Sequence, residues 1–92
     1  MNYWLLIYDL VDDYLDRREP LRPEHLALAK AAHDRGEMLQ AGALADPYDQ
    51  AVFVWRVADA DVIGRFVADD PYMRAGLVKS FRVRKWNVVV GG

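Results

Sequence analysis

The sequence has 92 residues, enough for one small domain over residues 1–92 but too few for a second core of roughly 50 or more residues. Its formal net charge is −2, with 12 Lys and Arg against 14 Asp and Glu, so it lacks the basic excess that would indicate a nucleic-acid partner. Apolar residues make up 53% and Cys is absent, which indicates a folded chain and excludes disulfides, thiolate nucleophiles and Cys-based metal centres.

The chain begins with an aromatic and aliphatic run at residues 3–8. This run is too short for a core helix and rich in strand-forming residues, so it predicts a first strand. Residues 9–21 are polar and mixed in charge, which predicts a long connection with one irregular turn near Tyr14 and Leu15.

A helix is predicted over residues 23–35. Pro23 suits the first helical position, because its fixed φ matches a helix and its missing N–H needs no partner there. Good helix formers follow it, and Gly36 suits the left-handed residue that stops a helix.

Two strands are predicted next, over residues 38–44 and 51–57, joined by a turn at residues 45–49. The pair forms a predicted hairpin. Gly42 interrupts the first of these strands, which indicates a bulge or a place where another group approaches the backbone closely.

A second helix and a last strand complete the chain. Asp59 is a natural cap, and apolar residues recur at helical spacing after it until residues 69–72 break the helix. A short bridge leads to a long strand predicted over residues 78–90, and the final two glycines are expected to fray.

The order strand, helix, strand, strand, helix, strand predicts an α+β, ferredoxin-like βαββαβ fold: a four-stranded antiparallel sheet with both helices on one face. In the third strand Phe53 and Trp55 face one side while Val52 and Val54 face the other, so both faces are apolar. The face without helices would then meet water. We therefore expect a homodimer that packs sheet on sheet, with a monomer exposing this face as the alternative.

The first nine residues have neither the positive start nor the small-residue cleavage site of a signal peptide. No apolar run approaches the roughly 20 residues of a membrane helix. These features predict no membrane association and a cytoplasmic protein.

His25 is the strongest candidate for chemistry. At about 100° per residue it bisects the arc formed by Leu28, Ala29 and Ala32, so it points inward from the first turn of its helix. The helix N-terminus favours a neutral imidazole, which is competent as a base. The alternative is a core histidine bonded to a backbone carbonyl, and His33, on the flank of the arc, is interpreted as a packing or capping residue.

Asp70 is the candidate partner of His25. It follows the second helix and precedes Pro71, and a carboxylate there could reach inward and orient an imidazole for general-base catalysis. Its alternative role is simply to end the helix before a proline. Asp34 lies opposite His25 on the first helix, which argues against Asp34 as the partner.

Several other side chains are candidates for binding. Arg22, one turn before His25, could contact an anion, with a surface salt bridge as the alternative. Tyr72 and Trp55 could line an aromatic pocket or simply fill the core. Arg82 and Arg84 alternate on one face of the last strand and could clamp a carboxylate if that face borders the pocket, although charges at a terminal strand more often protect a sheet edge.

No cofactor is predicted. Two histidines eight positions apart, without Cys, are a poor zinc-binding set, since a zinc site needs three or four convergent ligands. A single histidine binding haem is conceivable, but nothing in the sequence favours it.

Short motifs spread over nearly the whole chain resemble one family. Residues 22–26 read Arg-Pro-Glu-His-Leu, similar to the R-P-x-H-L signature of the YciI-like, or YCII-related, proteins. Residues 33–36 and 41–42 are similar to the H-x-x-G and glycine-turn segments of that family, and residues 69–72 to its D-P-Y segment. Where the family commonly has Gly-Pro after the second strand, this chain has Gly-Ala, which affects the local turn and a pocket wall.

The resemblance implies a dimeric α/β barrel with a site built around a His–Asp pair, here His25 and Asp70, and with Arg22, Gly42 and Tyr72 as candidate substrate-binding residues. It also implies a small cofactor-independent enzyme of lyase or isomerase type that abstracts a proton from a small cyclic or aromatic-derived metabolite. The alternative hypothesis is a non-catalytic dimeric domain that binds a small molecule or serves as an accessory domain.

Overall fold

Strand β1 (Asn2–Leu10) lies inside the sheet and pairs antiparallel with β3 (Gln50–Val57) on one side and β4 (Val78–Trp86) on the other. It is longer than the predicted strand over residues 3–8. Apolar patterning marks only its centre, whereas pairing on both sides extends the strand to Asn2 and Leu10.

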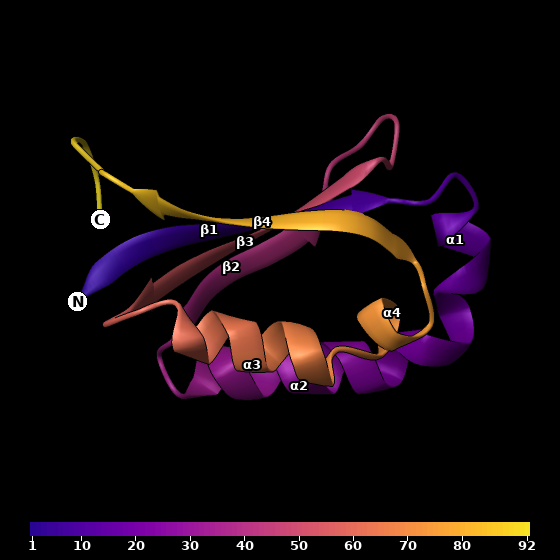
Figure 1. Ribbon diagram of the computed structural model, residues 1–92, viewed down its shortest axis with the longest axis horizontal. Coiled ribbons are helices and arrows are strands. Elements are labelled where there is room, and N and C mark those ends of the chain that lie inside the picture. Colours follow the sequence, from indigo (N-terminus) through magenta and orange to yellow (C-terminus); the bar gives the residue numbers. More distant parts are fainter.

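Strand β2 (Met38–Ala43) pairs antiparallel with the far edge of β3, so the sheet order is β2-β3-β1-β4. Figure 1 shows helices α2 (Arg22–Asp34) and α3 (Asp61–Asp69) lying together across one face of this sheet, with no helix on the other face. The predicted α+β, ferredoxin-like arrangement of a four-stranded antiparallel sheet with both helices on one face is confirmed. The structure describes residues 1–92 and is a computed structural model.

The predicted turn near Tyr14 and Leu15 is present, but residues 9–21 are more regular than predicted. The segment forms a helical turn, α1 (Tyr14–Arg17), and a 3₁₀ turn, η1 (Glu19–Leu21). Tyr14 is buried and packs edge-on against Tyr72, with 5.8 Å between ring centroids. This tertiary contact explains the order of a stretch whose own composition is polar.

Helix α3 ends at Asp69, and a second short helix, α4 (Pro71–Arg74), follows where only a bridge was predicted. The Asp70 carboxylate accepts the backbone N–H of Tyr72 at 3.0 Å, so Asp70 is the N-cap of α4. Proline is favoured at the next position, because the first helical N–H needs no acceptor.

The last strand ends at Trp86, four residues before the predicted end at residue 90. Trp86 pairs with Tyr3 near the beginning of β1, so the chain beyond it has little partner strand left. Val89 and Val90 are 91% and 88% exposed. Strand-forming composition is not sufficient without a neighbour that supplies hydrogen bonds.

The core lies between the sheet and the helices. Phe53 and Trp55 point into it, whereas Val52 and Val54 lie half-buried on the open face, so the predicted alternation of β3 is confirmed. None of the helices combines the length and the apolar character needed to cross a bilayer.

Candidate functional site

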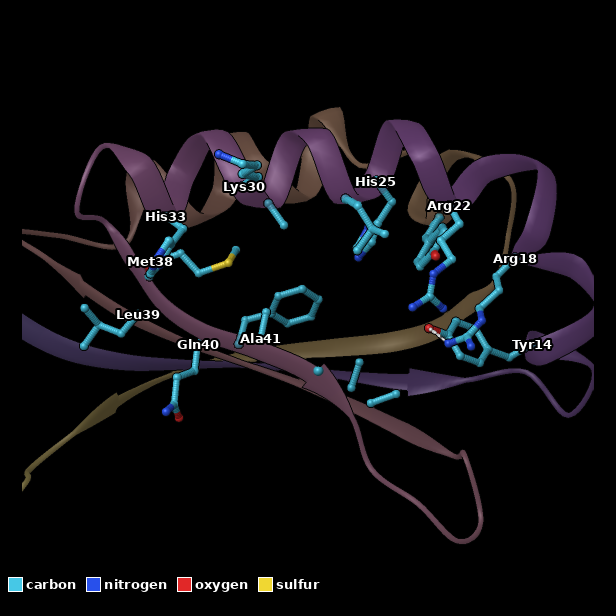
Figure 2. Close-up of a pocket in the computed structure, with 17 residues that line it drawn as sticks. Tyr14, Arg18, Arg22, His25, Lys30, His33, Met38, Leu39, Gln40 and Ala41 are labelled. Atoms are coloured by element: carbon cyan, nitrogen blue, oxygen red, sulfur yellow. Dashed lines mark hydrogen bonds between the residues drawn. The ribbon is translucent and has the colours of Figure 1, made fainter.

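A cavity of about 500 Å³ opens between α2 and the end of the sheet formed by β2 and β3. Figure 2 shows α2 above the cavity and the strands below it, with side chains converging from both. Most of the wall is apolar. The lining residues used below are Tyr14, Arg18, Arg22, His25, Lys30, Phe53 and Tyr72.

His25 projects from the first half of α2 toward the sheet, as its place on the helical arc predicted (Figure 2). Only 8% of the residue is exposed. Its ring stacks on Tyr72, with 3.8 Å between centroids and 7° between planes, and Phe53 and Phe66 meet it edge-on. Aromatic packing therefore fixes the plane of the imidazole ring.

Asp70 is completely buried, and its carboxylate accepts three hydrogen bonds. Oδ1 lies 2.8 Å from His25 Nδ1 and 3.0 Å from the backbone N of Tyr72, and Oδ2 accepts the Tyr8 hydroxyl at 2.7 Å. An ionised carboxylate only accepts hydrogen bonds, so Nδ1 carries a proton. In the neutral imidazole the lone pair is consequently on Nε2.

The two tyrosines around the pair remain protonated. Burial, and then the charge of Asp70, raise the pKa of Tyr8 far above its ordinary value, so Tyr8 acts as a hydrogen-bond donor. Burial raises the pKa of Tyr72 to about 12. The buried carboxylate therefore has neutral donors around it and no second negative charge beside it.

The predicted site residues divide into two groups. Arg22, Gly42 and Tyr72 line the cavity together with His25. Trp55 does not: it is buried in the core and packs against Phe66, with 5.2 Å between ring centroids.

The last-strand arginines lie elsewhere as well. Arg82 is opposite Ile7 and Arg84 opposite Leu5, on the open face of the sheet, so neither borders the cavity beneath the helices. The alternation of side chains along β1 explains this placement. Leu6 and Tyr8 face the helices, so Leu5 and Ile7, and the arginines opposite them, face away. Asp34 is exposed and bonded to Lys30 at 2.8 Å, consistent with its predicted exclusion as the partner of His25.

Sequence reasoning missed Tyr8, Tyr14 and Arg18. The alternation of β1 would have placed Tyr8 on the helix side of the sheet, but it does not say which residue meets the hydroxyl. Tyr14 and Arg18 lie in the polar segment that was interpreted as a connection, and no local pattern marks them. No three His, Asp or Glu side chains gather closely enough to hold a metal ion.

Comparison with known proteins identifies the family of the chain. The family model of the YCII-related domain matches residues 1–87. The chain belongs to the YCII-related domain family. The motifs around His25 and Asp70 therefore lie within a family match that spans almost the whole of this YCII-related chain.

Solved structures show the same fold. The 5-chloro-2-hydroxyhydroquinone dehydrochlorinase TftG from Burkholderia phenoliruptrix AC1100, in complex with 2,5-dihydroxybenzoquinone, is 20% identical with a TM-score of 0.76, and the alignment covers 92% of this YCII-related chain and 93% of TftG. A NIPSNAP family protein from Agrobacterium tumefaciens is 18% identical with a TM-score of 0.60, covering 92% and 90%. An antibiotic biosynthesis monooxygenase is 16% identical with a TM-score of 0.58, covering 98% and 100%. No curated protein matches the sequence.

Proposed function

We propose that this YCII-related protein is a small enzyme that uses His25 as a general base on a cyclic, aromatic-derived metabolite. One observation carries the proposal: the Nδ1 side of the imidazole is bonded to a buried carboxylate, while the same side chain lines an open cavity. That arrangement leaves Nε2 as the basic atom and fixes its direction.

The reaction begins when Nε2 takes a proton from a C–H group of the bound ring. The electron pair of that bond forms a new double bond as a leaving group departs with its own pair, or it stays as an enolate until the carbon skeleton is reprotonated at another position. Asp70 stabilises the imidazolium formed in this step, and Tyr8 and the Tyr72 N–H hold Asp70 in place.

The rest of the cavity suits such a substrate. Its volume of about 500 Å³ accommodates a small ring compound. Phe53 and Tyr72 supply aromatic walls, and Arg22 gives the wall a positive charge that suits an anionic substrate. TftG, which has the same fold, is a dehydrochlorinase of a hydroxylated ring compound, and this supports the choice of ring chemistry.

The test is hydrogen exchange on the substrate carbon. Hydroxylated ring compounds and cyclic ketones are incubated with the protein in D₂O, and C–H signals are followed by NMR. His25→Asn keeps a donor near Asp70 but removes Nε2, so exchange should fall by about 10²–10⁴-fold. Asp61→Asn is the control, because Asp61 is an exposed carboxylate on α3 that does not line the cavity, and it should leave exchange unchanged.

Exchange that survives in His25→Asn would refute the proposed base. Ligands that bind equally well to both forms without any exchange would favour the alternative function, a non-catalytic small-molecule-binding domain. Thermal unfolding of each variant separates loss of chemistry from loss of fold.

We further propose that two copies of the chain pack through the open face of the sheet. Leu5, Ile7, Val52 and Val54 form a half-buried apolar patch there, and no element of the chain covers it (Figure 1). Two such faces packed against each other would remove this patch from water. The arrangement leaves the cavity of each copy on the outer, helix-covered side.

A further inference from the structure

The charged groups in the cavity wall all have the same sign. Arg18, Arg22 and Lys30 line the cavity, and no Asp or Glu does, although the chain as a whole has a net charge of −2. The Lys30 ammonium is bonded to Asp34 at 2.8 Å, which neutralises it. The two arginines therefore carry the remaining positive charge of the wall.

The Arg18 side chain is held by Tyr14, but one of its N–H groups has no hydrogen-bond acceptor. Its side chain is 17% exposed, its guanidinium lies 5.2 Å from the centre of the Tyr14 ring, and Nη1 donates to the Tyr14 hydroxyl at 3.4 Å. The Nε atom is buried and has no hydrogen-bond partner. Its nearest carboxylate, in the largely exposed Glu19, lies 3.9 Å away, beyond hydrogen-bond distance.

Arg22 faces the same end of the cavity. It lies at the beginning of α2, and Figure 2 shows its guanidinium and that of Arg18 extending toward one another beside Tyr14. Arg22 forms no ion pair with any carboxylate of the chain. Arg22 has no counter-charge within the chain and Arg18 has only the exposed Glu19 at 3.9 Å, so a negatively charged ligand would compensate both partly buried guanidinium groups.

We propose that Arg18 and Arg22 form a carboxylate-binding subsite, so that the substrate is a planar ring carboxylic acid. The acid group occupies the arginine end, where the planar guanidinium groups of Arg18 and Arg22 supply N–H donors that match a carboxylate. The ring extends along the aromatic wall toward His25. This assignment deepens the proposed function and relies on it for the role of His25.

The aromatic wall favours this class over a neutral phenol. Tyr14 and Tyr72 both line the cavity and pack edge-on against each other; Tyr14 lies under the Arg18 guanidinium and Tyr72 is stacked on His25. A neutral phenol would fill the aromatic part of the cavity but bring only one acceptor oxygen and no negative charge to the two guanidinium groups. A carboxylate supplies two acceptor oxygens and the counter-charge, which favours the acid.

The experiment measures binding, not turnover. Benzoate, its neutral isostere benzamide, and phenyl phosphate are titrated into the full chain while the side-chain Nε–H signal of Arg18 is followed by NMR. Benzoate should shift that signal and bind at least about tenfold more tightly than benzamide. Arg18→Gln and Arg22→Gln should each weaken benzoate binding at least about tenfold, and Arg18→Lys should restore only part of the loss.

Arg65→Gln is the control for net charge, because Arg65 is exposed on α3 and does not line this cavity. No detectable benzoate binding, equal binding of benzamide, or an unchanged affinity in Arg18→Gln would overturn the subsite. Tighter binding of phenyl phosphate would overturn the carboxylate assignment. His25→Asn should still bind benzoate, so a failed base and a failed subsite give different results.

Discussion

Asp70 joins two roles in one buried side chain. Its Oδ1 caps α4 through the Tyr72 N–H and also accepts the His25 imidazole, while its Oδ2 accepts the Tyr8 hydroxyl. A completely buried carboxylate without such donors would be strongly destabilising. The hydrogen bonds that keep Asp70 in the fold are therefore the same ones that aim the imidazole.

Tyr8→Phe tests this coupling. The variant leaves Oδ2 of Asp70 buried without its donor, so the free energy of unfolding should fall by about 1.5–3 kcal/mol. Urea denaturation of the variant measures the change. Tyr3→Phe is the matched control on the same strand, since its hydroxyl bonds at the exposed C-terminus and its loss should cost less than about 0.5 kcal/mol. Equal stabilities of the two variants would contradict the role of Tyr8.

At the scale of elements, a glycine after helix α2 and a glycine inside helix α3 differ in whether the backbone needs a residue without a Cβ. Gly36 follows α2 with φ of +81°, the left-handed conformation that turns the chain toward β2, and its N–H bonds to the His33 carbonyl at 2.9 Å. Gly64 lies inside α3 with ordinary helical backbone, and a Cβ there would meet no atom within 4 Å. Only Gly36 is required by the backbone conformation.

The two alanine substitutions should change stability in opposite directions. Gly64→Ala should raise the free energy of unfolding by about 0.5–1 kcal/mol, because alanine loses less backbone entropy in a helix. Gly36→Ala should lower it by about 1–2 kcal/mol, because a Cβ is strained at positive φ. Thermal unfolding of both variants beside the parent chain measures the difference, and each serves as the control of the other. A stabilised Gly36→Ala would show that the turn can relax.

For the whole molecule, the sheet separates two environments. The helix-covered face holds the cavity with His25 and its positive wall, whereas the open face carries an apolar patch bordered by Arg82 and Arg84. Because alternate residues of one strand supply both faces, a change on the open face leaves the cavity side chains in place. Assembly and chemistry can therefore be tested independently.

Sedimentation velocity tests the proposed dimer. The unmodified chain should sediment as a dimer, and Val54→Asp, which places a charge in the middle of the open face, should weaken association at least about tenfold. Leu15→Asp is the control, because Leu15 is exposed on α1, away from this face. A parent chain that sediments as a monomer at every concentration would refute the assembly.

Local patterns in the sequence were sufficient for the order of elements and for the direction of key side chains. The alternation of residues 51–57 predicted that Phe53 and Trp55 share one face of β3 and Val52 and Val54 the other, and the helical arc placed His25 on the inward face of α2. Pro23 and Gly36 predicted the limits of α2 to within one residue. These features depend on neighbours a few positions away, so periodicity and turn chemistry determine them.

Only the tertiary structure decided which distant residues meet. Tyr8, His25 and Asp70 come from a strand, a helix and a helix boundary, and they converge because the strand register and the helix crossovers bring those elements together. Arg18 enters the cavity wall because Tyr14 anchors a polar segment against Tyr72. Strand β4 ends at Trp86 because its partner β1 begins beside it. Pairing, packing and burial act between segments far apart in the chain, and no pattern within a single segment carries that information.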